Sequence, residues 1–137
     1  MITTAAELSR VRYQPDKHYR LMNDIDMTGY SWAPIGNSPA GAFTGTFEGN
    51  GHTISNLTLT STGSEYNGFF GYIDGAGIYN LNIVNASYTL NETHARGASV
   101  GGICAFARNN ATIENCVFNG TITATSQVVS AGGIAGD

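Results

Sequence analysis

The sequence predicts an all-β protein, a right-handed parallel β-helix (solenoid) with a short N-terminal capping helix. The first observation behind this prediction is composition: 18 Gly, 15 Thr, 13 Asn and 10 Ser favour strands and turns over helices. The second is an internal repeat, in which glycine-rich segments recur 34 and then 31 residues apart, at Gly68, Gly102 and Gly133. The third is a helix-capping signal near the start of the chain.

Length and charge limit the class of protein. The 137 residues suit one domain, and a hydrophobic fraction of 42% is enough for a core. Only 12% of the residues are charged. Four of the six basic residues lie within the first twenty positions: Arg10, Arg12, Lys17 and Arg20. Because no basic stripe continues beyond residue 20, we expect no nucleic-acid partner. No apolar run approaches the roughly 20 residues of a membrane span, so we expect none.

The N-terminal segment, residues 1–18, is expected to cap the fold. Thr4 and Glu7 have the spacing of a capping box, in which each side chain bonds the other residue's backbone amide. Pro15 should end the helical turn that follows. Residues 19–137 are then expected to form stacked coils whose open end the helix covers.

Three segments share the frame Ile-x-Asn-apolar-x-apolar: residues 52–59, 76–83 and 111–118. A unit of this size cannot bury its own apolar face, so successive coils must stack at the spacing of paired strands, about 4.8 Å. Asn tolerates the backbone of a tight bend, and stacked amides can bond one another. An antiparallel sandwich, the competing all-β fold, would pair strands as hairpins and needs no column of one residue type. The predicted ladder consists of Asn56, Asn80 and Asn115.

Residues 84–99 lengthen the spacing of that frame from 24 to 35 residues, which predicts an insertion that leaves the coil as a loop or strand pair. Charged and aromatic residues gather in this stretch, and loops on rigid scaffolds often carry binding residues. The candidate ligand-contact residues are Tyr88, Glu92, His94 and Arg96.

Few residues have the spacing of a catalytic or metal site. Asp24, Asp26 and Glu48 could form a carboxylate cluster for acid–base chemistry or calcium, or could cap turns. Cys104 and Cys116 lack further Cys or patterned His partners, so they are not expected to bind metal. They are expected as buried thiols, or alternatively as a disulfide between neighbouring coils. We expect no catalytic residues, no metal and no cofactor.

Five motifs extend through nearly the whole chain: ITTAAELSRV, YRLMNDIDMTG, WAPIGN, FTGTFEGNGHTISNLTL and GGIAG. Together they resemble the GLUG-motif repeat regions of bacterial surface proteins and IgA-specific metallopeptidases. The chain departs from the pattern at NGFFGYI, where Phe replaces an apolar or small residue, and at GGICAF, where Ala105 and Phe106 replace the closing Gly. The resemblance implies a secreted or cell-surface location within a larger protein and no catalysis by the repeat. No HExxH motif is present, so the peptidase activity of some relatives is not expected in this chain.

The expected function is therefore a non-catalytic structural or binding module of an exported bacterial protein, such as a stalk or an adhesin. The alternative is a β-helix enzyme that binds or degrades polysaccharides. The expected partner is a protein or a glycan at a surface. Because no capping signal follows the last GGIAG motif, residues 119–137 are also expected to mediate end-to-end self-association between copies of the chain.

Overall fold

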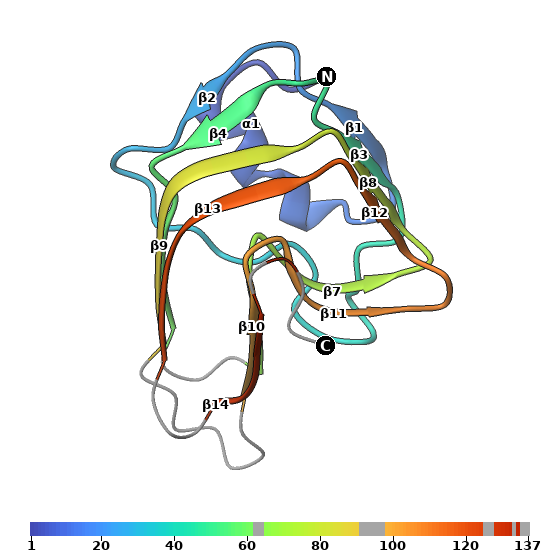
Figure 1. Cartoon of the computed structure of the whole chain (residues 1–137). Helices are drawn as coiled ribbons and strands as arrows, with labels where there is room; N and C mark the ends of the chain where they lie inside the picture. The colour runs from blue at the N-terminus through green and yellow to red at the C-terminus, as the bar shows by residue number, and fades with distance from the viewer. Residues whose placement is uncertain (62–64, 91–97, 125–127, 133, 135–137) are drawn as a thin grey trace.

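The computed structural model describes residues 1–61, 65–90, 98–124, 128–132 and 134, and every strand pair among them is parallel. The strands form four sheets around one core (Figure 1). The first sheet contains β1 (His18–Arg20), β3 (Thr46–Glu48), β8 (Gly77–Tyr79) and β12 (Thr112–Glu114). The second contains β2 (Ile25–Asp26), β4 (Thr53–Ser55), β9 (Asn82–Leu90) and β13 (Val117–Ala124), with β5 (Thr58–Ser61) also paired to β9. The third contains β6 (Tyr66–Asn67), β10 (Ala98–Gly101) and β14 (Val128–Gly132), and the fourth contains β7 (Phe70–Asp74) and β11 (Cys104–Arg108).

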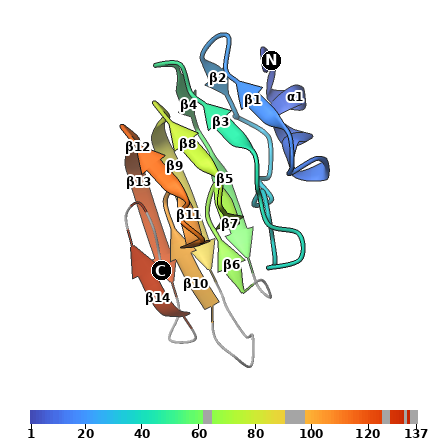
Figure 2. The same ribbon diagram turned by 90° about the vertical axis from the view of Figure 1, so that its right-hand side faces the viewer.

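Apart from β4 and β5, which both belong to the second sheet, strands that are consecutive in sequence lie in different sheets, and from β8 onward the order of sheets repeats along the chain. Strands β8, β9, β10 and β11 visit the first, second, third and fourth sheet, and β12, β13 and β14 then visit the first three again. Each of these later strands pairs with the strand one coil earlier. Figure 2 shows these strands side by side in successive layers. The all-β fold with stacked parallel strands is thus as the sequence predicts.

Apolar side chains of equivalent positions stack to form the core, but not in the predicted register. Ile78 pairs with Ile113, as the sequence predicts, and with Phe47 on its other side. The repeat frame predicts Ile54 in the same column, but Ile54 pairs with Ile83, which lies in the second sheet. The predicted frame therefore occurs at two different corners of the coil. Its first two segments are buried, since Ile54, Ile78 and Ile83 have no exposed surface, whereas Ile113 in the third segment is half-buried.

The N-terminal cap forms as predicted. Helix α1 (Ala5–Ser9) begins after Thr4, whose hydroxyl accepts from the Glu7 amide, and the Glu7 carboxylate accepts from the Thr4 amide in return. A 3-10 helix (Val11–Tyr13) follows. Leu8 and Val11 are buried in the core, and α1 lies at the end of the stack beside β1 (Figure 2).

The expected insertion at 84–99 is wrong over its first half. Residues 84–90 belong to β9, which pairs with β5 on one side and with β13 on the other. They therefore continue the coil and do not leave it. The spacing is irregular in sequence because the aligned segments come from different corners. Residues 91–97 lie outside the described part of the chain.

Glycine is required where successive coils approach most closely. A Cβ atom on Gly68 would lie 2.4 Å from the backbone oxygen of Gly101, one coil later. The glycine at this position therefore allows the two coils to approach where a side chain would collide with the backbone. Both cysteines are free thiols in the structure: Cys104 is buried, as expected, and Cys116 is half-buried.

Candidate functional site

Tyr88, which the sequence predicts as a ligand contact, is buried in the core of the structure. Its side chain has no exposed surface, and its hydroxyl donates a 2.9 Å hydrogen bond to the backbone oxygen of Gly102. Burial raises the pKa of this phenol well above its usual range. The alternation of buried Ala86, Tyr88 and Leu90 along β9 explains the inward position, because every second residue of a strand faces the same side. Glu92, His94 and Arg96, the other candidates, lie outside the described residues, so their role stays a prediction.

The predicted asparagine ladder exists, but it is divided between two corners. At the first corner, the side-chain amide of Asn115 donates to Asn80 over 2.8 Å, and Asn80 donates to the carboxylate of Glu48 over 3.0 Å. At the second corner, Asn85 donates to Asn56, and Asn56 donates to Asp26 over 2.9 Å. Asn56 therefore does not belong to the ladder of Asn80 and Asn115. Each ladder runs across three coils and ends on a carboxylate.

The backbone at these corners explains why asparagine occupies them. Asn56, Asn80, Asn85 and Asn115 have φ angles of 60°, 52°, 54° and 54°, in the left-handed region that asparagine tolerates better than other residues with a side chain. The same arrangement recurs at a third corner, where Asn109, with φ 56°, donates to Asp74 over 2.6 Å. One residue type thus provides both the bend and the bond between coils.

The carboxylates with a possible role in acid–base chemistry are hydrogen-bonded as structural acceptors. Asp26 accepts from Asn56 and Thr28, and these bonds lower its pKa from 3.8 to about 2. Asp24 accepts from the backbone amide of Thr53 and contacts His52, which lowers its pKa as well. A general acid at neutral pH needs a raised pKa, so these shifts have the wrong sign for that role. Within the described residues, no group of three or more His, Cys, Asp or Glu side chains is placed to hold a metal ion.

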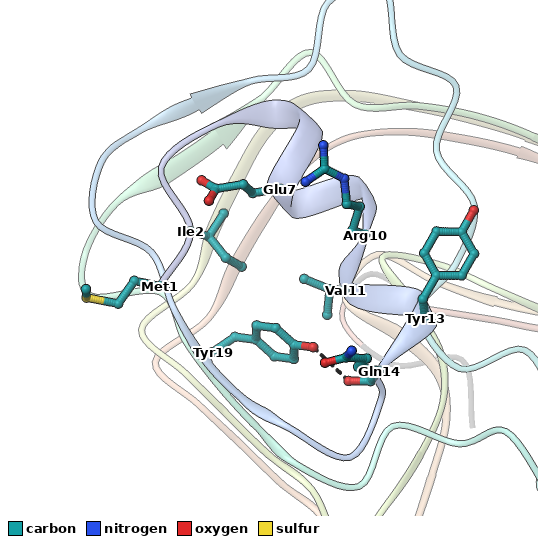
Figure 3. Close-up of a pocket in the computed structure, with 8 residues that line it drawn as sticks. All are labelled: Met1, Ile2, Glu7, Arg10, Val11, Tyr13, Gln14 and Tyr19. Carbon is teal, nitrogen blue, oxygen red and sulfur yellow. Dashed lines mark hydrogen bonds between the residues drawn. The ribbon is translucent and has the colours of Figure 1, made fainter.

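Three adjoining hollows lie on the N-terminal cap, and the sequence did not predict them. The first hollow, of 330 Å³, lies between α1 and β1 (Figure 3). Its lining consists of Met1, Ile2, Glu7, Arg10, Val11, Tyr13, Gln14 and Tyr19. The second, of 430 Å³, shares Tyr13 with the first and adds Arg12. The third, of 250 Å³, shares Tyr19 with the first and adds His18 and Arg20. We call these three together the cap hollows.

The signal that could have located the cap hollows is the cluster of basic residues in the first twenty positions. Among the described residues, the ion pairs are His52–Asp24 and Arg108–Asp74, so neither Arg10 nor Arg20 has a carboxylate partner there. Arg12 lies over the ring of Tyr13, 4.8 Å from its centroid, and donates to its hydroxyl. The cap therefore carries positive charge on a chain whose formal net charge is −4.

The fold and the corners define a class of protein, an all-β domain of stacked parallel strands tied by carboxylate-ended asparagine ladders. No family model matches the chain. The chain is 36% identical over 130 residues to Halomucin of Haloquadratum walsbyi, covering 86% of this chain and 1% of that protein. It is 32% identical over 123 residues to a protein of Evansella cellulosilytica named "Putative Gly-rich membrane protein", covering 83% of this chain and 14% of that protein.

A solved structure has the same fold. A crystal structure from Bacteroides ovatus, described as a "putative immunoglobulin A1 protease", superposes with a TM-score of 0.65 at 26% identity. The match covers 99% of this chain and 52% of that one. The chain thus corresponds to a small part of each sequence relative and to about half of the structural one. This neighbour supports the general kind of protein that the GLUG-motif resemblance implies.

Proposed function

We propose that this chain is a non-catalytic structural or binding module, like a stalk or an adhesin, of an exported bacterial protein. We also propose that its four parallel sheets are the walls of a right-handed β-helix of the GLUG-motif kind. The repeating order of the sheets and the similarity to the Bacteroides ovatus structure support this finer description of the fold. The module would act by presenting a rigid surface, because successive coils are joined by both backbone and ladder hydrogen bonds.

The non-catalytic proposal rests on one observation: the carboxylates at the ends of the ladders accept hydrogen bonds from the protein itself. Glu48 accepts from the side chain of Asn80 and from the backbone amide of Asn50 over 2.6 Å. Asp26 accepts hydrogen bonds from the side chain of Asn56 and from the backbone amide of Thr28. A carboxylate that bonds the corners together is not free to exchange protons with a substrate at neutral pH without loosening the stack. This arrangement favours a structural role for the acids.

A secreted or cell-surface location has separate support. The names Halomucin and Gly-rich membrane protein fit proteins that act outside the cytoplasm. In the described part of the chain, no helix has the length and apolarity required to cross a bilayer. Antibodies raised against this domain should label intact cells of the source organism or detect the domain in the culture medium. Signal confined to lysed cells would contradict the proposed location.

The alternative function is a polysaccharide-active enzyme. It is favoured by one observation, the exposure of Asp24 and Asp26 on the outer surface near one end of the stack. Incubation with pectin, alginate and mucin glycans distinguishes the two functions. We expect no shortening of any chain. Depolymerisation that disappears in a folded Asp26→Asn variant would overturn the non-catalytic proposal.

A further inference from the structure

The cap hollows combine three features that together indicate a ligand. They form a row, since the first hollow adjoins the second at Tyr13 and the third at Tyr19. Each hollow is lined by one arginine, Arg10 in the first, Arg12 in the second and Arg20 in the third. Each is also lined by at least one tyrosine. The row is therefore long, cationic and partly aromatic.

The charge in these hollows is available to a ligand. Two acids line them, Glu7 and Glu48, and both carboxylates are already hydrogen-bonded within the protein. Glu7 Oε1 accepts from the amide and hydroxyl of Thr3 at 2.8 and 2.7 Å, and Glu48 bonds Asn50 and Asn80. Arg10 and Arg20 are exposed and have no ion pair with a described residue. Because these bonds come from neutral donors, both carboxylates keep their charge, and the three arginines of the row exceed its two carboxylates by one formal charge.

We propose that the row of cap hollows binds an acidic polysaccharide, with the arginines on its carboxylate or sulfate groups and the tyrosines against its sugar rings. This inference rests on the binding role proposed above and names its ligand class and site. Guanidinium groups bond two oxygens of one anionic group through paired N–H donors. Tyrosine offers a flat apolar face with a polar edge, and Tyr13 is 69% exposed.

The shape of the site favours a glycan over an acidic peptide. Peptide anchors fill enclosed, fully desolvated pockets. The first hollow is instead open, and its floor offers only Ile2 and Val11 between Glu7 and Arg10 on one side and Tyr19 on the other (Figure 3). Three adjoining hollows, each lined by an arginine and a tyrosine, suit a polymer with a repeated unit.

Calorimetric titration of the whole chain with polygalacturonate, hyaluronan and dextran sulfate tests the proposal. We expect at least one of them to bind, uncharged dextran not to bind, and added salt to weaken the binding. Arg10→Gln and Arg12→Gln should each weaken it about tenfold, the size of one charge-assisted hydrogen bond. Arg108→Gln is the matched control, since it removes the same charge from a residue that pairs with Asp74 outside the hollows, and it should have little effect.

A second variant separates sugar recognition from simple charge attraction. Tyr13→Ala keeps every charge and alters an exposed side chain, so it should fold normally and still bind the charged glycan more weakly. Binding of poly-glutamate as tight as that of the glycans would overturn the glycan class. An equal loss in Arg108→Gln, or no binding of any charged glycan, would overturn the site. None of these three results bears on the non-catalytic role, which depends on the depolymerisation assay.

Discussion

The side-chain amide of Asn115 donates to the side-chain oxygen of Asn80 across 2.8 Å, although the two residues are 35 positions apart. Asn80 in turn donates to Glu48, 32 positions earlier. The bonds run in one direction along the stack, from amide to amide to carboxylate. A chain of aligned hydrogen bonds is strengthened when it ends on a charge. The carboxylates in the earlier coils therefore stabilise the coils that follow.

Replacing Asn80 should show how much this ladder contributes. We expect Asn80→Leu to lower the free energy of unfolding by about 2–4 kcal/mol, because it removes a bond to a charged group and strains a left-handed backbone. Asn80→Gly accepts that backbone and loses only the side-chain bonds, so its loss should be smaller, about 1–2 kcal/mol. Urea unfolding curves of both variants measure the difference. Coincident midpoints for Asn80→Leu and the parent would show that the ladder contributes nothing.

The sequence predicts the ladder but places Asn56 at the wrong corner, for a physical reason. Asn56 and Asn80 have similar local surroundings, because each follows a short strand with a buried Ile and bends the chain through a left-handed backbone. Local sequence therefore looks the same at both corners. The true spacings within a corner are 29 residues for Asn56–Asn85 and 35 for Asn80–Asn115. Only the pairing of strands distinguishes them.

The capping helix and the cap hollows differ in how far the sequence could predict them. The capping box depends on residues three apart, Thr4 and Glu7, so local rules were sufficient. The cap hollows join residues such as Tyr13 and Gly36, which become neighbours only through the fold. The prediction for Tyr88 is wrong for a related reason. Its charged neighbours in sequence suggest exposure, whereas its strand position places it in the core.

Acid should weaken the second ladder through Asp26. Its pKa falls from 3.8 to about 2 in the folded chain because Asn56 and Thr28 bond the ionised form. A carboxyl whose folded pKa is lowered stabilises the fold above the unfolded pKa, and this contribution is lost as pH falls through the folded value. We therefore expect urea midpoints to fall between about pH 4 and pH 2. The fall should be shallower in Asp26→Asn than in the parent, and parallel profiles would contradict the assignment.

Gly45 joins the cap to the first sheet at a point where no side chain fits. A Cβ atom there would lie 1.8 Å from the backbone oxygen of Lys17. Gly45→Ala should therefore force the backbone apart and cost about 3 kcal/mol or more. Gly29→Ala is the control, because Gly29 has a φ of 86° but no neighbouring atom within 4 Å, and should cost about 1 kcal/mol. Thermal unfolding of the two variants compares the cost of a steric clash at Gly45 with the cost of a left-handed backbone at Gly29. Equal losses of unfolding free energy would contradict the proposed crowding.

Tyr88 is expected to act in stability and not in binding. Tyr88→Phe keeps the ring that packs 5.2 Å from the ring of Phe118 and removes the hydroxyl that bonds Gly102. The backbone oxygen of Gly102 would then lose this buried donor, at a cost of about 1–2 kcal/mol. Polygalacturonate binding at the cap hollows should be unchanged, since Tyr88 lies in the core on β9 and is not among the residues that line them. Denaturant unfolding and calorimetry on the same preparation measure both quantities. Reduced glycan affinity with unaltered stability would restore Tyr88 as a ligand contact.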